Sequence, residues 1–251
     1  MSSDVTVEVR EDHVAVVEFS RPPHNHFDAA LIGALADAYD RIAEDRASRA
    51  IVLCSSGRHF CAGADFGGGD NPAGASLYDE AYRLVAGETP VVAAVQGAAV
   101  GGGLGVAMTA DFRVASPESR FVANFSRLGI HHGFGLTVTL PAVVGPQRAL
   151  EVLSFGERIK GEDAFAMGLC DRLVPAEALR DEAIALAARL AEAAPLALRS
   201  IRQTMRSDVV ERFRDATLHE QTEQEALFAT EDFGEGVSAA SERRTPRFGG
   251  R

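Results

Sequence analysis

The sequence has 251 residues, of which 46% are hydrophobic and 24% are charged, and its formal net charge is −11. This composition is typical of a soluble globular protein, and the length fits one large domain or one domain with an appendage. The acidic balance disfavours a nucleic-acid-binding or anionic-membrane-binding surface, so we expect neither partner.

The three cysteines, Cys54, Cys61 and Cys170, are sparse and do not have the spacing of metal ligands. Isolated cysteines in odd number are typical of reduced thiols. The chain shows no N-terminal basic region followed by an apolar run, and no apolar stretch of transmembrane length. We therefore predict a cytoplasmic protein with no metal site and no membrane segment.

The first part of the chain predicts strands that alternate with helices. Val5–Arg10 and His13–Ser20 alternate apolar and polar residues, which indicates a hairpin. Asp28 is a candidate N-cap for a helix that runs to about Asp45. Ala50–Cys54 is a short apolar run typical of a buried strand.

The middle of the chain continues this alternation. After a glycine-rich loop at 67–74, we expect a helix over about Ser76–Gly87. Asp111–Ser116 and Arg120–Val122 are predicted as short strands, and the following two helices are separated at Gly145-Pro146.

The last part is predicted to be almost wholly helical. Gly161–Met167 indicates a short helix and Leu169–Val174 a strand; from about Ala176 onwards the pattern is helical, with breaks near Pro195 and Gly234. Alternating strands and helices up to about residue 175 predict an α/β class. We assign residues 1–194 to an α/β core and residues 195–251 to a helical C-terminal region.

The most informative stretch is Gly97–Ala107, which reads GAAVGGGLGVA. It follows a predicted buried strand at Pro90–Gln96 and opens a predicted helix with the triplet Gly101–Gly103. Free N–H groups at a helix start can donate to an anion or an oxyanion, although a tight strand-to-helix turn explains the glycines equally well. A dinucleotide fingerprint fails, because its third glycine would fall at Val106.

Two segments together resemble the signatures of the crotonase family, also called the enoyl-CoA hydratase/isomerase superfamily. They are His59–Phe66, which reads HFCAGADF, and Gly97–Gly103. Weaker matches occur in order along the chain, at Arg21–Asn25, at Leu128–Gly135 and at Asp232–Phe248. By this resemblance the chain is identified as a member of that family.

The resemblance implies a fold and a ligand. The fold would be a spiral of ββα units with a helical C-terminal trimerisation region, and the assembly a homotrimer or a dimer of trimers. The ligand would be an acyl-CoA thioester, with coenzyme A as part of the substrate and no separate cofactor. The peptide N–H groups of Ala64 and Gly102 would form an oxyanion hole for the thioester oxygen.

The resemblance also implies which residues border coenzyme A. They would be His24, Asp65, Phe66 and Gly67. Arg243 and Arg244 are candidates for its phosphates, and a solvated basic tail explains these two arginines as well.

The chain departs from the hydratase pattern at two positions. Hydratases of this family resemble one another in two glutamates that act on water, and the corresponding positions here are Gly105 and Phe125. Neither side chain can transfer a proton. We expect a void at Gly105 and an apolar ring at Phe125, and we expect both residues to border the substrate. The acyl pocket should therefore be less polar than that of a hydratase.

Other side chains are candidates for the missing acid and base. His132, and after it His131, lie in a loop that other family members use for such a residue, although a histidine bonded to backbone is the ordinary alternative. Some relatives place a catalytic group on the helix after the glycine-rich loop, where this chain has Tyr78, Asp79 and Tyr82. Cys61 is predicted to be a packed thiol rather than a nucleophile.

Two functions of different class remain open. The first is an enzyme that acts through a thioester enolate or oxyanion, by isomerisation, atypical hydration or lyase chemistry, or hydrolysis. The second is a non-catalytic acyl-CoA-binding protein or carrier.

Overall fold

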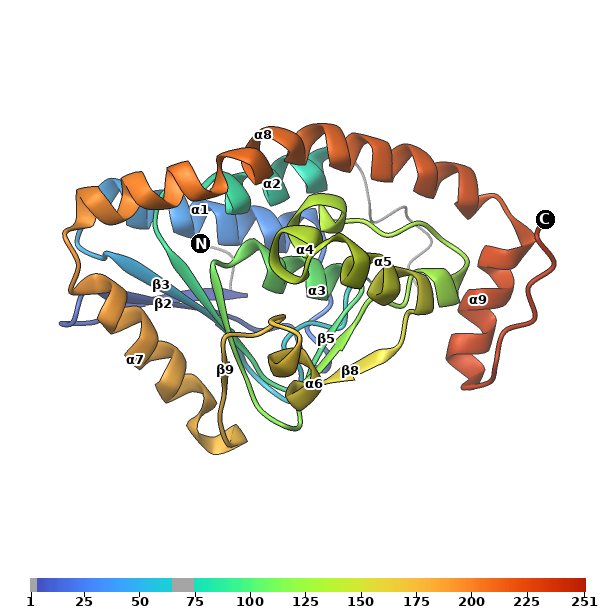
Figure 1. Cartoon of the computed structure of the whole chain (residues 1–251), viewed down its shortest axis with the longest axis horizontal. Coiled ribbons are helices and arrows are strands. Elements are labelled where there is room, and N and C mark those ends of the chain that lie inside the picture. The colour runs from blue at the N-terminus through green and yellow to red at the C-terminus, as the bar shows by residue number, and fades with distance from the viewer. Residues whose placement is uncertain (1–3, 65–74) are drawn as a thin grey trace.

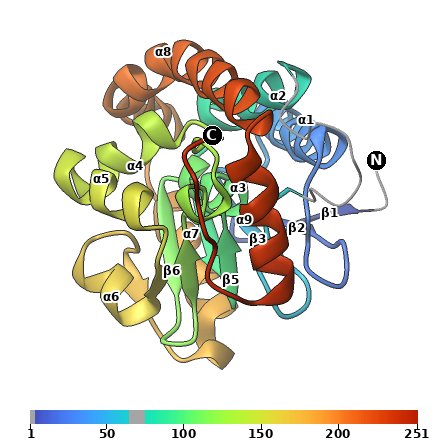
Figure 2. The ribbon, with the colours of Figure 1, turned by 90° about the vertical axis from the view of Figure 1, so that its right-hand side faces the viewer.

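Two β-sheets form the framework of the protein (Figures 1 and 2). The computed structural model describes residues 4–64 and 75–251. The larger sheet has the strand order β1-β2-β3-β4-β6-β9; only β1 is antiparallel to its neighbour, and the other pairs are parallel. Its strands are β1 (Val5–Val9), β2 (Val14–Phe19), β3 (Ala50–Ser55), β4 (Val91–Val95), β6 (Phe112–Ala115) and β9 (Arg172–Leu173).

The smaller sheet has the order β5-β7-β8. Its strands are β5 (Ala98–Val100), β7 (Arg120–Val122) and β8 (Arg158–Lys160). The sequence predicted β7 but not β5 or β8: β5 lies within the glycine-rich stretch that we interpreted as a turn into a helix, and β8 is a three-residue strand without a buried apolar run. The connection from β4 to the glycine triplet therefore contains a strand of a second sheet.

Helices cover both faces of the larger sheet, which explains why β3 and β4 are buried along their whole length. Ile51 and Leu53 pack toward α1 (Ala29–Asp45), α2 (Ala75–Ala86) and α3 (Gly102–Thr109). Val52 points to the opposite face, which α7 (Leu179–Ala191) covers with Leu179 and other apolar residues. Neighbouring side chains of one strand thus belong to two cores.

Several predicted boundaries are confirmed. The hairpin β1-β2 forms, and Asp28 caps α1 by accepting a hydrogen bond of 2.8 Å from the Leu31 N–H. The helices α4 (Leu136–Val144) and α5 (Pro146–Phe155) are separated at Gly145, and α6 (Gly161–Ala166) follows β8.

The C-terminal part consists of the long helix α8 (Pro195–Phe228) and α9 (Glu231–Glu242). In Figure 1, α8 runs along one side of the molecule over α2 and α4. The predicted break near Gly234 is wrong. Gly234 lies inside α9, and the chain turns at Thr230, whose hydroxyl caps α9 by accepting from the Phe233 N–H.

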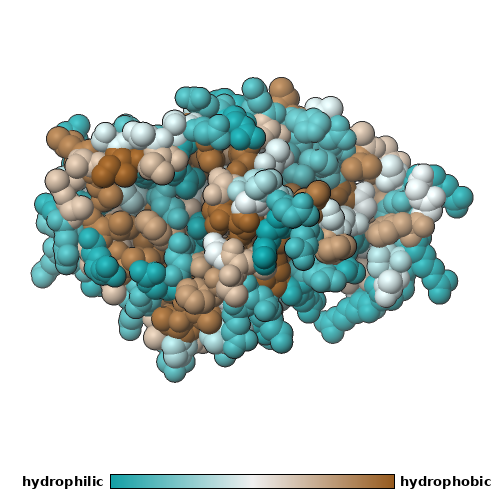
Figure 3. Space-filling view, viewed as in Figure 1, coloured by the Kyte–Doolittle hydropathy of each residue, from teal (hydrophilic) through white to brown (hydrophobic). Residues whose placement is uncertain are grey.

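Ion pairs and apolar contacts fix α8 to the core. Arg202 and Arg206 bind the Asp111 carboxylate at 2.8 and 3.1 Å, and Phe213 is fully buried. Other apolar side chains of α8 are exposed, among them Leu196 and Met205. Figure 3 shows apolar surface at the end of the molecule where α8 begins. Self-association through the C-terminal helices remains a prediction.

Within the part of the chain that the structure describes, no helix is both long and apolar enough to cross a bilayer.

Candidate functional site

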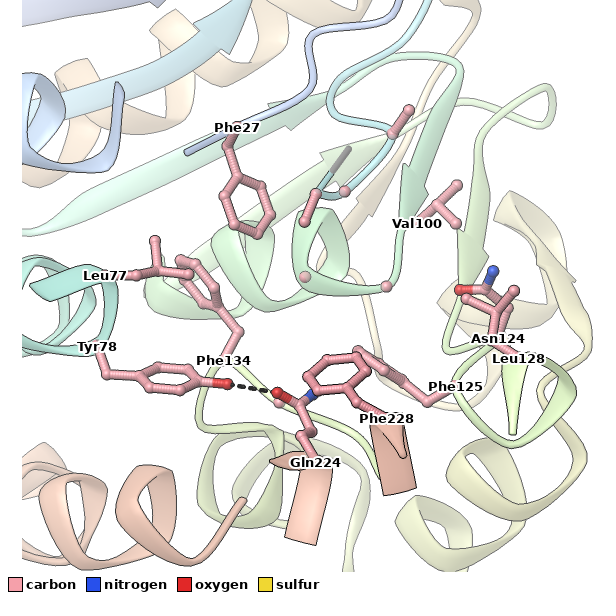
Figure 4. Close-up of a pocket in the computed structure, with 16 residues that line it drawn as sticks. Phe27, Leu77, Tyr78, Val100, Asn124, Phe125, Leu128, Phe134, Gln224 and Phe228 are labelled. Carbon is pink, nitrogen blue, oxygen red and sulfur yellow. Dashed lines mark hydrogen bonds between the residues drawn. The ribbon is translucent and has the colours of Figure 1, made fainter. Parts of the chain in front are cut away.

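A pocket of about 120 Å³ lies where the start of α3 meets α2, α8 and the segment 62–64 (Figure 4). Most of its wall is apolar, from Phe27, Leu77, Phe125, Leu128, Phe134 and Phe228. Three polar side chains also line it, Tyr78, Asn124 and Gln224. In the described part of the wall, no side chain carries a formal charge at neutral pH.

The two predicted oxyanion donors, Ala64 and Gly102, lie together at this pocket. Cys61 pairs in parallel with Ala99, through the bonds Cys61 N–H to Ala98 O at 3.0 Å and Val100 N–H to Cys61 O at 2.9 Å. Ala64 and Gly102 each lie three residues beyond this bridge on their own segment, and a Cβ at Gly63 would lie 3.8 Å from the Gly102 nitrogen. Both residues line the pocket.

Glycine at position 63 is required for this close approach. Gly63 has a φ of +90°, and a Cβ there would lie 2.7 Å from the Val100 carbonyl oxygen and 3.8 Å from the Gly102 nitrogen. Any larger residue would therefore separate the two segments. The segment 61–64 and the glycine triplet form one structural unit for this reason.

The N–H groups of Ala64 and Gly102 are available to a ligand. Gly102 is the first residue of α3, where a backbone N–H has no intrahelical acceptor. Neither N–H has an acceptor among the residues at 4–64 and 75–251. Two such donors at a helix start can stabilise negative charge that develops on a carbonyl oxygen.

The two positions at which the resemblance places the hydratase glutamates, Gly105 and Phe125, differ in their surroundings. Phe125 is buried and its ring lines the pocket, as predicted. The predicted void at Gly105 is wrong, because a Cβ at Gly105 would lie only 2.5 Å from the Cβ of Phe134. Phe134 fills this space and separates Gly105 from the pocket. Gly105 therefore does not line the pocket, although we expected it to border the substrate.

The two histidines proposed as acid or base do not line the pocket, although the next residues, Gly133 and Phe134, do. The Nδ1 atom of His131 lies 2.8 Å from the His132 carbonyl oxygen, and the two rings stack at 4.1 Å. The Nε2 atom of His132 lies 2.9 Å from the Thr137 hydroxyl. Both imidazoles thus have the ordinary structural role of loop histidines.

The electrostatics also disfavour His132 as a base. Burial, together with His131 and His219, lowers the pKa of His132 to about 3. A group with so low a pKa is poorly matched to proton transfer near pH 7. Its contact of 3.8 Å with Glu220 is therefore not an ion pair at neutral pH, because the imidazole is uncharged.

Glu220 of α8 holds the start of α4. Its carboxylate is completely buried and accepts hydrogen bonds from the Gly135 and Thr137 N–H groups at 2.8 and 2.9 Å. Burial raises the pKa of Glu220 to about 7, although these hydrogen bonds lower it. By fixing the start of α4, Glu220 also fixes Phe134 on the pocket wall.

Of the three candidates on α2, only Tyr78 reaches the pocket. It is 7% exposed, and its hydroxyl donates to the Gln224 side-chain oxygen at 3.1 Å (Figure 4). Asp79 is exposed and pairs with Arg214. Tyr82 lies under the guanidinium of the same arginine, 3.9 Å from ring centroid to Cζ.

Sequence analysis missed Gln224 and Glu220. They belong to a stripe of α8 with the spacing i, i+4, i+7 and i+11, formed by Phe213, Thr217, Glu220 and Gln224, all buried. This spacing places them on one helical face. Polar residues on a face that also carries a buried phenylalanine are the signal that could have identified them.

Cys61 is a packed thiol, in agreement with the prediction. It is buried, does not line the pocket, and burial raises its pKa to about 12. A thiol with this pKa is not a nucleophile near pH 7.

A groove continues from the pocket and shares Val100, Asn124 and Leu128 with it. His24 lies in this groove as expected, and its loop is held by Asn25, whose amide donates to the Ser56 and His59 carbonyls at 2.8 Å. Asp65, Phe66 and Gly67, which were predicted to border the same ligand, lie outside the described residues.

The groove is rich in arginine. Five arginines line it, Arg58, Arg127, Arg158, Arg243 and Arg244. Arg244 is neutralised by Glu235 and Glu242, and Arg127 lies 3.6 Å from Glu157. No described carboxylate pairs with the other three, so the groove attracts anions although the chain as a whole is acidic.

Comparisons with known proteins agree with this geometry. The family model described as enoyl-CoA hydratase/isomerase matches residues 9–251. A probable enoyl-CoA hydratase of Bacillus subtilis (strain 168) is 33% identical over 249 residues, which are 96% of each chain. A crotonyl-CoA hydratase of Syntrophomonas wolfei is 32% identical over 253 residues, which are 95% of each chain.

Solved structures show the same architecture. A crystal structure of an enoyl-CoA hydratase/isomerase from Pseudoalteromonas atlantica T6c superimposes with a TM-score of 0.89, at 28% identity, over 98% of this chain and 100% of the other. The α/β fold with its helical C-terminal region is thus that of these proteins. The chain belongs to the enoyl-CoA hydratase/isomerase family.

Proposed function

We propose that this protein binds an acyl-CoA thioester and acts on it as an enzyme. The thioester oxygen lies between the N–H groups of Ala64 and Gly102, and the acyl group lies in the apolar pocket. The phosphates of coenzyme A lie along the groove, near Arg58, Arg158 and Arg243. The names of the hydratase relatives support this ligand class.

The observation that supports the proposal is that Ala64 and Gly102 both line the pocket, just beyond the parallel bridge of Cys61 with Ala99, and that neither N–H has an acceptor among the described residues. An enolate or a tetrahedral intermediate carries negative charge on the thioester oxygen. The two donors stabilise this charged oxygen more than they stabilise the uncharged carbonyl oxygen of the ground state. In comparable sites the loss of one donor costs about 3–4 kcal/mol, or about 10²–10³ in turnover.

The proton transfers do not follow the two-glutamate mechanism of hydratases. This part of the proposal rests on the family resemblance, which places Gly105 and Phe125 at the two positions. It is supported by the pocket wall, whose described residues include no carboxylate and no imidazole. Isomerisation, atypical hydration or lyase chemistry, and thioester hydrolysis all pass through an oxyanion that the two donors stabilise.

The test is a panel of saturated, 2-enoyl, 3-enoyl and aryl acyl-CoAs, incubated with the purified protein and analysed by mass spectrometry. We expect one class to be converted, and the product identifies the reaction. If no acyl-CoA binds at millimolar concentration, the assignment of the ligand is wrong.

The second candidate is a non-catalytic acyl-CoA-binding protein. The uncharged pocket favours it, since Tyr78 is the one ionisable side chain on the described wall. Burial and the nearby Glu220 raise the pKa of Tyr78 far above neutrality, which makes it a poor proton carrier. Micromolar binding with every thioester recovered intact would support this candidate, and enzyme-dependent conversion would exclude it.

A further inference from the structure

The wall of the pocket formed by α2 and α8 carries a pair of neutral hydrogen-bonding side chains, Tyr78 and Gln224. They are 7% and 4% exposed, and the Tyr78 hydroxyl points to the Gln224 amide (Figure 4). Few polar side chains are buried to this extent without a structural or functional reason.

The hydrogen bonds of the pair fix its orientation. The Nε2 of Gln224 donates to the His131 carbonyl oxygen at 2.9 Å, so its side-chain oxygen must face the Tyr78 hydroxyl. A Cβ at Gly133 would lie 2.7 Å from both the Gln224 Nε2 and the Tyr78 oxygen. Glycine at 133 therefore allows the pair to approach the loop closely and to stay in one position.

The pair retains unused hydrogen-bonding capacity. A glutamine amide has two N–H donors and two oxygen lone pairs. The bonds to His131 and Tyr78 use one donor and one lone pair of Gln224, and no described residue takes the others. One donor and one acceptor are thus fixed beside an otherwise apolar wall, which is the complement of a hydroxyl or a carbonyl oxygen.

The surrounding charges limit which polar group fits. Since the described wall of the pocket has no cation, a carboxylate placed there would be buried without a partner. A purely hydrocarbon acyl group would leave the free groups of Gln224 without water or a partner.

We propose that Tyr78 and Gln224 select acyl-CoA thioesters whose acyl group carries a neutral oxygen substituent, a hydroxyl or a keto oxygen. This inference rests on the proposed function, because it assumes that the acyl group occupies this pocket. It assigns Gln224 as the residue that contacts the substituent and Tyr78 as the residue that orients Gln224.

The test is calorimetric binding of butyryl-, 3-hydroxybutyryl-, 4-hydroxybutyryl- and succinyl-CoA. We expect at least one hydroxyacyl thioester to bind about tenfold more tightly than butyryl-CoA, as one further hydrogen bond predicts, and succinyl-CoA to bind more weakly than butyryl-CoA. If all four bind alike, the inference is wrong while the proposed function stands. If none binds, the proposed function itself fails.

Variants locate the effect. Tyr78→Phe and Gln224→Met should each reduce the ratio of the affinities for the hydroxyacyl thioester and for butyryl-CoA to less than threefold. Tyr82→Phe, one turn further along α2 and outside the pocket, is the matched control and should keep the preference. If a pocket variant with an unchanged melting temperature loses affinity for both thioesters equally, this result would contradict a role of the substituted residue in selection.

Discussion

The pocket and the groove that joins it are suited to bind different parts of a ligand by opposite physical means. The pocket is buried and uncharged in its described part, and its polar groups are fixed by hydrogen bonds. The groove is open and carries Arg58, Arg158 and Arg243, all exposed and without an ion-pair partner among the described residues. Interactions in the pocket depend on geometry and resist salt, whereas those in the groove act over a longer range and are screened.

The largest effect is expected from removing one donor of the pocket. Ala64→Pro deletes the N–H that we propose as a donor to the thioester oxygen, and Ala64→Gly, the matched control, keeps it. We expect kcat/KM on the substrate found in the panel to fall about 10²–10³ in the proline variant and less than tenfold in the glycine variant. The loss should be the same at low and high salt, and a loss that disappears at high salt would contradict the comparison.

The second effect concerns the carboxylate that supports the pocket wall. Folding raises the pKa of Glu220 from 4.5 to about 7, so the folded state binds the proton more tightly than the unfolded state does. The contribution of Glu220 to the free energy of unfolding, up to about 3 kcal/mol, is therefore fully present below pH 4.5. It is lost as the pH rises to about 7.

Chemical denaturation of the wild type and of Glu220→Gln across pH 4–8 measures this loss. The free energy of unfolding of the wild type should fall relative to that of the variant as the pH rises. The same comparison in a His132→Asn background removes the contribution of His132, whose pKa is lowered and whose Nε2 lies 3.8 Å from Glu220. A difference between the two proteins that does not change with pH would show that Glu220 has an ordinary pKa.

The third effect tests the packing behind the pocket. Gly105→Ala places a Cβ against the Cβ of Phe134, which cannot move away as the end of a flexible side chain can. We expect a loss of about 1–3 kcal/mol in the free energy of unfolding. Gly234→Ala is the control, because Gly234 lies in α9 with open space around it, and it should be neutral or stabilising. If both substitutions change the free energy of unfolding equally, position 105 has space for a side chain, and our conclusion that Phe134 fills this space is wrong.

The smallest effects are expected in the groove. Alanine at Arg58, Arg158 or Arg243 should each weaken binding of acyl-CoA by about two- to tenfold at low ionic strength, since each removes one exposed charge. The effect should decrease at 0.5 M salt. The same variants should bind the corresponding acyl-pantetheine, which lacks the nucleotide phosphates, as the wild type does; a loss with this ligand would place the arginines in the pocket.

Those features that depend on local pattern were predictable from the sequence. The hairpin, the Asp28 cap and the division at Gly145 follow from alternation, capping and a helix breaker. That Ala64 and Gly102 line one pocket could be expected only from the resemblance, because the two segments, bridged at Cys61 and Ala99, are 38 residues apart and each segment alone is compatible with an ordinary turn.

The remaining features depend on tertiary packing and were not accessible from the sequence. A glycine in place of a larger residue leaves a void only if no other side chain occupies the space. At Gly105 the space is occupied by Phe134, which lies 29 residues further along the chain. His132 was favoured from its position in a loop, but the direction of a side chain in a loop is set by its partners, here Thr137. Gln224 reaches the pocket from α8 and Gly133 reaches it from a loop 91 residues earlier in the chain, and only the fold brings the two residues together.

The central claim is that the Ala64 and Gly102 N–H groups polarise a thioester carbonyl. The most direct test is difference infrared spectroscopy of a saturated acyl-CoA, labelled with 13C at the thioester carbonyl, bound to the wild type, Ala64→Gly and Ala64→Pro. We predict that the carbonyl stretch moves to lower frequency than in water in the wild type and in Ala64→Gly, and returns toward its value in water in Ala64→Pro. A bound thioester whose carbonyl frequency in the wild type equals that in water would contradict the claim.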